Sequence, residues 1–132
     1  MKNIYLTLTL LLSTLIFSSF SYAEWTKVAI HKNGNIEYID PEKIKIDGSS
    51  RYYWVLEDFL IPNRSGAMSM KIYTQAECDL RQTRNLKYAT FELSMGEGAA
   101  KSIWSAHDKK WRYVKSNSIA ESNVKFVCSY QK

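Results

Sequence analysis

Two long segments in the middle of the chain alternate apolar and polar residues with a period of two. In residues 51–59, Tyr52, Trp54 and Leu56 lie on one side of an extended chain, and the residues between them lie on the other. Residues 67–79 continue the alternation. Aromatic and β-branched residues favour strands, and this pattern is typical of an antiparallel sheet with one face towards water. We therefore expect a sheet built around these two strands.

Shorter strands should flank the central pair. Asn33-Gly34 follows an alternating segment at residues 25–31, and this dipeptide is typical of a two-residue hairpin loop because both residues accept positive φ. Such a loop would pair Ala29 with Tyr38. Further short strands are expected at residues 88–95, 101–106 and 111–114.

The end of the chain changes from strand to helix periodicity. Ser118 with Glu121 three residues later forms a capping box, and apolar residues then recur at helical spacing up to Cys128. We expect one amphipathic helix over residues 119–130. The predicted fold is α+β, with about six antiparallel strands and a C-terminal helix on one face of the sheet.

Residues 1–23 have the pattern of a secretory signal peptide. Lys2 gives a positive start, residues 4–17 form an apolar run, and Ser21 and Ala23 are small residues before a cleavable bond. Residues 24–132 are then expected to form a single β-rich domain, exported to the periplasm, the cell surface or the medium. No Cys comes directly after the apolar run, and no second long apolar segment is present. We therefore expect neither lipidation nor a transmembrane span after processing.

Two cysteines remain, Cys78 and Cys128, and in an oxidising compartment an even pair predicts a disulfide. The bond would join residues 50 positions apart. It would tie the predicted helix to the strand that ends at residue 79.

The predicted mature chain has 17 of the 18 Lys and Arg residues and all 13 acidic residues, a formal charge of +4. This charge favours anionic partners, while the compartment argues against nucleic acid. The candidate binding residues form two basic clusters, one of which contains an aromatic ring: Arg81, Arg84, Lys87, Lys109, Lys110, Trp111, Arg112 and Lys115. Adjacent strands could join them into one anion-binding patch; a solvated surface is the alternative.

The sequence predicts no enzyme, cofactor or metal site. His31 and His107 each lie beside a turn without another ligand at metal-binding spacing, so both are expected on the surface. Four carboxylates could pair across strands as in a glycosidase, but acidic residues on the wet face of a sheet explain them better: Glu57, Asp58, Glu77 and Asp79. We expect no catalytic residues.

The order of short motifs resembles that of the surface-adhesin protein E-like family of Gram-negative bacteria. The motifs are Trp25-x-x-Val28, Tyr38-Ile39-Asp40-Pro41, Trp54-Val55-Leu56-x-Asp58-Phe59, Met95-Gly96-x-Gly98 and Val127-Cys128. The resemblance implies an antiparallel sheet whose C-terminal helix is held by a disulfide. It also implies adhesion to host matrix and serum proteins such as vitronectin and laminin. The named adhesin of the family is a lipoprotein, whereas this chain has no lipidation Cys.

A second function stays open beside adhesion. The chain could be a soluble periplasmic partner or inhibitor of a cell-envelope enzyme that acts by inserting the polar loop at residues 62–66. The sequence names neither the ligand nor the oligomeric state.

Overall fold

The computed structural model describes residues 24–131, so the predicted signal peptide lies outside the described residues. One eight-stranded antiparallel sheet contains β1 (Thr26–Ile30), β2 (Ile36–Ile39), β3 (Lys45–Asp47), β4 (Ser50–Asp58), β5 (Ser69–Glu77), β6 (Gln82–Phe91), β7 (Ala100–Ser105) and β8 (Arg112–Tyr113). The 3-10 turns η1 (Pro41–Lys43) and η2 (Ser94–Gly96) and the helix α2 (Ile119–Ser129) complete the described elements. None of the described helices combines the length and apolar character needed to cross a membrane.

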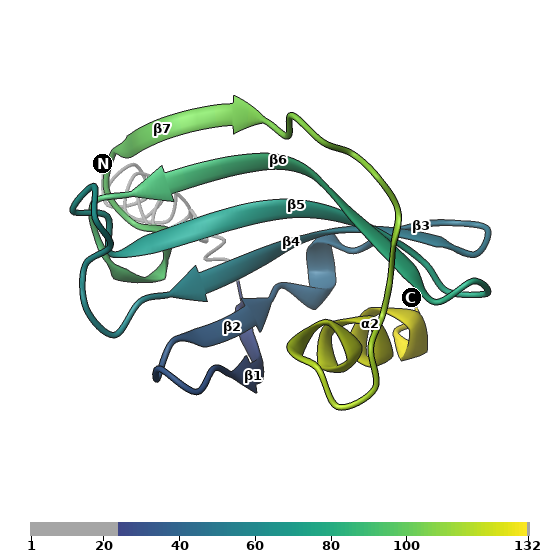
Figure 1. The fold of residues 1–132 in the computed structure, drawn as a ribbon. Helices are drawn as coiled ribbons and strands as arrows, with labels where there is room; N and C mark the ends of the chain where they lie inside the picture. Colours follow the sequence, from purple (N-terminus) through teal and green to yellow (C-terminus); the bar gives the residue numbers. More distant parts are fainter. Residues whose placement is uncertain (1–23, 132) are drawn as a thin grey trace, which may run out of the picture.

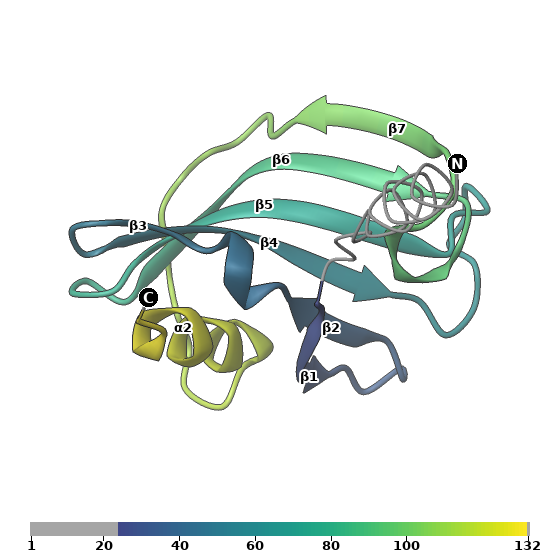
Figure 2. The same ribbon diagram turned by 180° about the vertical axis from the view of Figure 1, so that it is seen from behind.

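The strands follow the order β1-β2-β4-β5-β6-β7, with β3 paired to β4 and β8 paired to β6. The sheet is strongly twisted, and α2 lies beside the β1–β2 hairpin on one face of it (Figure 1 and Figure 2). The predicted α+β fold is confirmed. The sheet has eight strands, slightly more than the expected number of about six. The three-residue β3 was not predicted, whereas β8 lies within the strand expected at residues 111–114.

The core lies between α2 and the sheet. Val124 and Val127 of α2 pack into a cluster of buried side chains from β2, β4, β5 and the segment after η1: Ile39, Ile44, Tyr53, Val55 and Ala76. Tyr53 and Val55 alternate with Tyr52 and Trp54, so the second pair faces away from the helix. The period-two pattern of residues 51–59 therefore divides a core face from an opposite face, as predicted.

The β1–β2 hairpin differs from its predicted register. The Gly34 N–H donates to the His31 carbonyl, Gly34 has a φ of +91°, and the His31 N–H donates to the Asn35 carbonyl. These features define a three-residue loop of residues 32–34, not a two-residue loop at Asn33-Gly34. Ala29 therefore lies opposite Glu37, and the predicted pairing of Ala29 with Tyr38 is wrong.

The predicted strand at residues 88–95 is also wrong in its limits, since β6 begins at Gln82 and ends at Phe91. Its first half is polar, but these side chains find partners on β5. Arg84 donates to Gln75 at 2.9 Å, and the Thr74 hydroxyl donates to Asn85 at 3.3 Å. The ladder between β5 and β6 is irregular at Tyr73 and Thr74, which breaks the alternation along β6.

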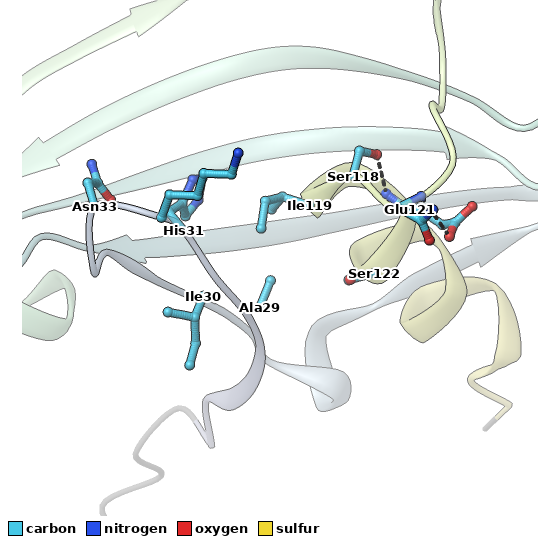
Figure 3. Close-up of a pocket in the computed structure, with 10 residues that line it drawn as sticks. Ala29, Ile30, His31, Asn33, Ser118, Ile119, Glu121 and Ser122 are labelled. Atoms are coloured by element: carbon cyan, nitrogen blue, oxygen red, sulfur yellow. Dashed lines mark hydrogen bonds between the residues drawn. The ribbon is translucent and has the colours of Figure 1, made fainter.

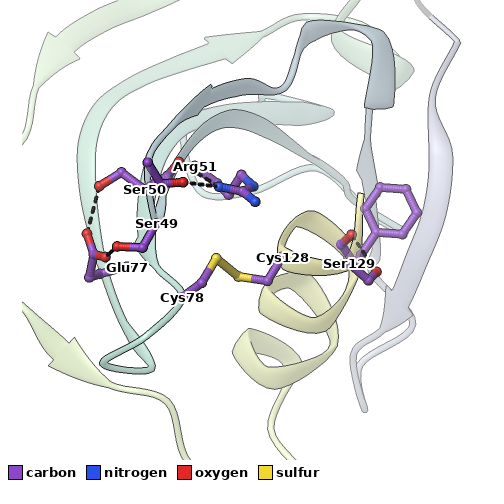
Figure 4. Close-up of a disulfide and its surroundings, with 9 residues drawn as sticks. Ser49, Ser50, Arg51, Glu77, Cys78, Cys128 and Ser129 are labelled. Carbon is purple, nitrogen blue, oxygen red and sulfur yellow. Dashed lines mark hydrogen bonds between the residues drawn. A yellow bond between two sulfur atoms is a disulfide. The ribbon is translucent and has the colours of Figure 1, made fainter. Parts of the chain in front are cut away.

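The predicted helix and disulfide are confirmed. The Ser118 hydroxyl accepts from the Glu121 backbone N–H at 3.1 Å, which caps α2. Cys78 follows β5 directly and is bonded to Cys128 in the last turn of α2, with the two Cα atoms 5.9 Å apart (Figure 4). Beside the bond, the hydroxyls of Ser49 and Ser50 donate to the Glu77 carboxylate. The end of β5 is thus fixed to both α2 and the start of β4.

Candidate functional site

Aromatic and cationic side chains occupy neighbouring positions on the face of the sheet that points away from α2. Trp54, Tyr73 and Lys87 are consecutive partners across β4, β5 and β6, and opposite residues of an antiparallel ladder share a face. The next row contains Tyr52 and Arg84. We call this surface the aromatic–cationic face and define it by Lys45, Tyr52, Trp54, Tyr73, Arg84, Lys87 and Trp111.

Each cation of this face lies over a ring. The Arg84 Cζ atom is 4.5 Å from the centre of the Trp111 ring, and Lys87 Nζ is 6.0 Å from the centre of Tyr73. Lys45 Nζ is 5.8 Å from the centre of Tyr52. Such pairs occur roughly once per 70–80 residues in proteins, so three on one face are a concentration. The Arg84 Nε atom also donates to Gln75 Oε1 at 2.9 Å, which helps to fix the orientation of the guanidinium.

A further cation lies between two rings towards η2. Lys71 Nζ is 5.5 Å from the centre of the Trp25 ring and 4.8 Å from the centre of Phe91. Burial lowers the pKa of Lys71, and repulsion from Lys43 lowers it further. Lys71 is the opposite partner of Leu56 on β4, so it lies on the same side of the sheet as Trp54. This side therefore carries cations along most of the length of β5.

The structure brings three of the eight predicted binding residues together on the aromatic–cationic face: Arg84, Lys87 and Trp111. The two predicted basic clusters meet at the contact between Arg84 and Trp111. The other four residues of this face were not among the predicted binding residues: Lys45, Tyr52, Trp54 and Tyr73. Their alternation with core residues contained the signal, but the ladder was needed to place them beside Arg84 and Lys87.

The other five predicted residues lie elsewhere. Arg112 is opposite Thr83 and therefore points to the α2 side of the sheet, where it binds Asp108 at 3.2 Å. Arg81 pairs with Glu121 of α2 at 2.8 Å. Lys115 lines a hollow of about 520 Å³ that also contains Arg112. Lys109 and Lys110 are exposed in the segment before Trp111.

A larger hollow of about 880 Å³ lies between the β1–β2 loop and the first turn of α2 (Figure 3). His31 lines it, but this side chain does not lie freely on the surface as expected. Its Nε2 atom is 2.9 Å from Glu37 Oε1, and the side chain is 30% exposed. Glu57 also departs from expectation: it is half-buried on the α2 side, opposite Glu37, and not on a wet face. The contact of Glu37 with His31 was not predicted, because the expected hairpin register paired Ala29 with Tyr38 and not with Glu37.

Comparisons with known proteins identify a family and solved structures that this chain resembles. The model of the surface-adhesin protein E family matches residues 25–129. Among solved structures, one of Haemophilus influenzae protein E has a TM-score of 0.60 at 13% identity, covering 83% of this chain and 87% of that chain. Its selenomethionine form has a TM-score of 0.59 at 16% identity, covering 79% and 87%. Protein E from non-typeable Haemophilus influenzae has a TM-score of 0.56 at 12% identity, covering 84% and 79%.

At these identities the structural matches demonstrate a shared fold. No curated protein sequence matches the chain significantly. The family match covers all but the ends of the described residues and confirms the resemblance inferred from the order of motifs. The chain belongs to the surface-adhesin protein E family.

Proposed function

We propose that this protein is an exported, non-enzymatic, adhesin-like binding protein that recognises acidic host or matrix proteins, or anionic polymers, through its aromatic–cationic face. Membership of a surface-adhesin family supports the class of function. We choose this surface because Arg84, Lys87 and Lys45 each lie over an aromatic ring on one face of the sheet.

The chemistry of this face suits carboxylate and sulfate groups. A guanidinium presents a planar set of donors that matches a carboxylate in a two-bond geometry. The aromatic rings beneath the cations add contact area, and their side chains lose little conformational entropy when a ligand binds. The rings of Trp54 and Tyr73 lie 4.9 Å apart between the cationic positions, so an acidic chain crossing the strands would meet both charge and apolar surface.

Surface-immobilised vitronectin, laminin and heparin provide the direct test. We expect saturable binding to at least one of them that weakens as salt rises from about 0.1 M to about 1 M, because the Debye length then falls from about 10 Å to about 3 Å. Arg84→Ala combined with Lys87→Ala should weaken the binding by about tenfold or more, since it removes two cations from one surface.

Lys32→Ala combined with Lys125→Ala is the matched control for charge, because it also removes two cations. Lys32 and Lys125 are exposed on the α2 side of the sheet, so their loss should change affinity by less than about twofold. Equal effects of the control and the double variant would show that net charge alone drives binding. Absence of saturable binding to all three ligands would contradict the proposal.

A second candidate function is a periplasmic partner of a cell-envelope enzyme. The loop after β4 is preformed, because the Asn63 side-chain oxygen accepts from the backbone N–H groups of Ser65 and Ala67. Beside it, Leu60 and Ile61 are 67% and 73% exposed. A pull-down from periplasm with the native protein and an Ile61→Asp variant tests this function. A partner recovered by both proteins, or by neither, would exclude insertion of this loop.

A further inference from the structure

Three potential metal ligands from separate parts of the chain meet on the α2 side of the sheet. Glu37 of β2 and Glu57 of β4 are direct partners in the ladder, and His31 begins the loop between β1 and β2. His31 Nε2 is 2.9 Å from Glu37 Oε1 and 3.9 Å from Glu57 Oε1. One ligand atom from each residue can be chosen so that all three lie within 4.8 Å of one another.

The two carboxylates form an unfavourable pair unless a cation balances them. Like charges directly opposite each other on adjacent strands are destabilising, and burial increases the cost. Glu37 is only 7% exposed, and the side chain of Glu57 is 16% exposed. Within residues 24–131, no Lys or Arg pairs with either carboxylate. Among the described residues, the imidazole of His31 is the group that lies within ion-pair distance of both carboxylates, 2.9 Å from Glu37 and 3.9 Å from Glu57.

Two amide side chains hold the carboxylates in place. Asn35 Nδ2 donates to Glu57 Oε1 at 3.0 Å, and Asn123 Nδ2 of α2 donates to Glu37 Oε2 at 2.6 Å. Carboxylates that bind metals are commonly oriented by such outer hydrogen bonds. The donors come from the hairpin loop and from α2, so the arrangement depends on the tertiary fold and not on one local turn.

Asn123 provides an independent observation at the same place. This residue is 8% exposed, and its Oδ1 atom is buried with no hydrogen-bond partner among the described residues. The same amide group donates to Glu37 through Nδ2, so the unpaired oxygen belongs to a side chain that contacts the cluster. A buried acceptor without a partner costs free energy, and a water molecule bound to an ion at this cluster would satisfy it.

We propose that His31, Glu37 and Glu57 bind a divalent transition-metal ion, with Zn²⁺ as the ion that fits best. Two ligands about 2.0 Å from a tetrahedral zinc ion lie about 3.3 Å apart. The two measured His31–carboxylate distances fall on either side of this value. An imidazole ligand favours zinc over the oxygen-preferring Ca²⁺ and Mg²⁺.

The ion would neutralise the two facing carboxylates and join β1, β2 and β4. His31 also lines the hollow of about 880 Å³ between the β1–β2 loop and α2, which gives the ion a route from solvent (Figure 3). With three protein ligands, the fourth tetrahedral position is open to water. The bonded pair Cys78–Cys128 supplies no thiolate, so zinc binding by cysteine does not compete.

Isothermal titration of the chelator-treated protein, carrying no histidine tag, tests the site with ZnCl₂ as the probe. We expect one Zn²⁺ per chain, micromolar or tighter affinity, a rise in melting temperature on binding, and no comparable binding of CaCl₂. His31→Gln and Glu57→Gln should each weaken Zn²⁺ binding by at least about tenfold. Glu57→Gln should retain or raise the melting temperature of the metal-free protein, because it removes one of two like charges.

His107→Gln is the matched control, because His107 is exposed in the segment after β7. This variant should bind Zn²⁺ with the same affinity as the wild-type protein. Unchanged Zn²⁺ affinity in His31→Gln and Glu57→Gln, or equal losses in all three variants, would place the ion elsewhere and overturn the proposal. Absence of saturable Zn²⁺ binding by the wild-type protein would overturn it as well, and would leave His31 as a hydrogen-bonding partner of Glu37 alone.

Discussion

Removal of the Cys78–Cys128 disulfide should produce a large loss of stability. The bond closes a 50-residue separation and fixes the last turn of α2 to the end of β5. Replacing both cysteines by Ala leaves the buried contacts of Val124 and Val127 in place, although Cys128 also packs against the core. The double variant therefore separates the cross-link from the packing of the helix.

The size of the effect follows from the length of the closed loop. The chain-entropy model assigns about 4 kcal/mol to a loop of 50 residues, through the freedom that the unfolded chain regains. This is a large share of the ~5–15 kcal/mol that stabilises a small domain. With a slope of roughly 2 kcal/mol per molar urea, the unfolding midpoint should fall by roughly 2 M.

Urea unfolding followed by tryptophan fluorescence measures this change. Wild-type protein reduced with dithiothreitol is the control and should unfold at the same midpoint as the Ala double variant. A difference between the two would indicate that the substitutions disturb packing. A loss of less than about 1 kcal/mol in both would refute the argument that the bond acts through the unfolded chain.

Three further predictions concern single positions. Gly34→Ala should cost about 1–2 kcal/mol in urea unfolding, because φ is +91° there and the added Cβ would lie 2.8 Å from Leu60 Cδ2; unchanged stability would argue against the three-residue loop. Val127→Ala, in a fully buried site, should cost about 2 kcal/mol by the same assay. Hydrogen bonds from the Asn117 backbone N–H and, to a smaller extent, from the Lys125 side chain hold the pKa of Glu121 below its usual 4.5. Its stabilisation is therefore present at neutral pH and lost as pH falls through the folded-state pKa, so thermal melts of Glu121→Gln should show a smaller acid-side loss than wild type.

The elements that sequence analysis predicted are those whose pattern is local. The alternation around Trp54 reports directly which residues share a face of the sheet, and Ser118 with Glu121 marks the start of α2 through its own hydrogen bond. The two cysteines predict their bond because no other cysteine is present. The strand and helix patterns depend on neighbours along the chain and the disulfide on the cysteine count, so all three can be predicted without knowing the ladder.

The candidate sites could be predicted only in part, because they depend on register. One additional residue in the hairpin loop moves Glu37 opposite Ala29 and brings His31 within hydrogen-bond distance of it. The contact of Arg84 with Trp111 likewise requires that β8 pairs with β6. The irregularity of the β5–β6 ladder between Tyr73 and Thr74 places Arg84 on the same face as Lys87. Composition indicated which residue types matter, but the spatial partners were set by strand pairing, which places Tyr73 beside Lys87 and Glu37 beside Glu57.

The position of the disulfide has a consequence for cleavage by proteases. All eight binding candidates, residues 81–115, lie between Cys78 and Cys128 and thus inside one covalent ring. A single cut in the exposed segments at residues 92–100 or 106–111 would open the ring without releasing either piece. On a non-reducing gel the nicked protein would migrate as one species, and it would separate into two fragments only after reduction. The binding candidates would therefore stay attached to the domain after such a cut.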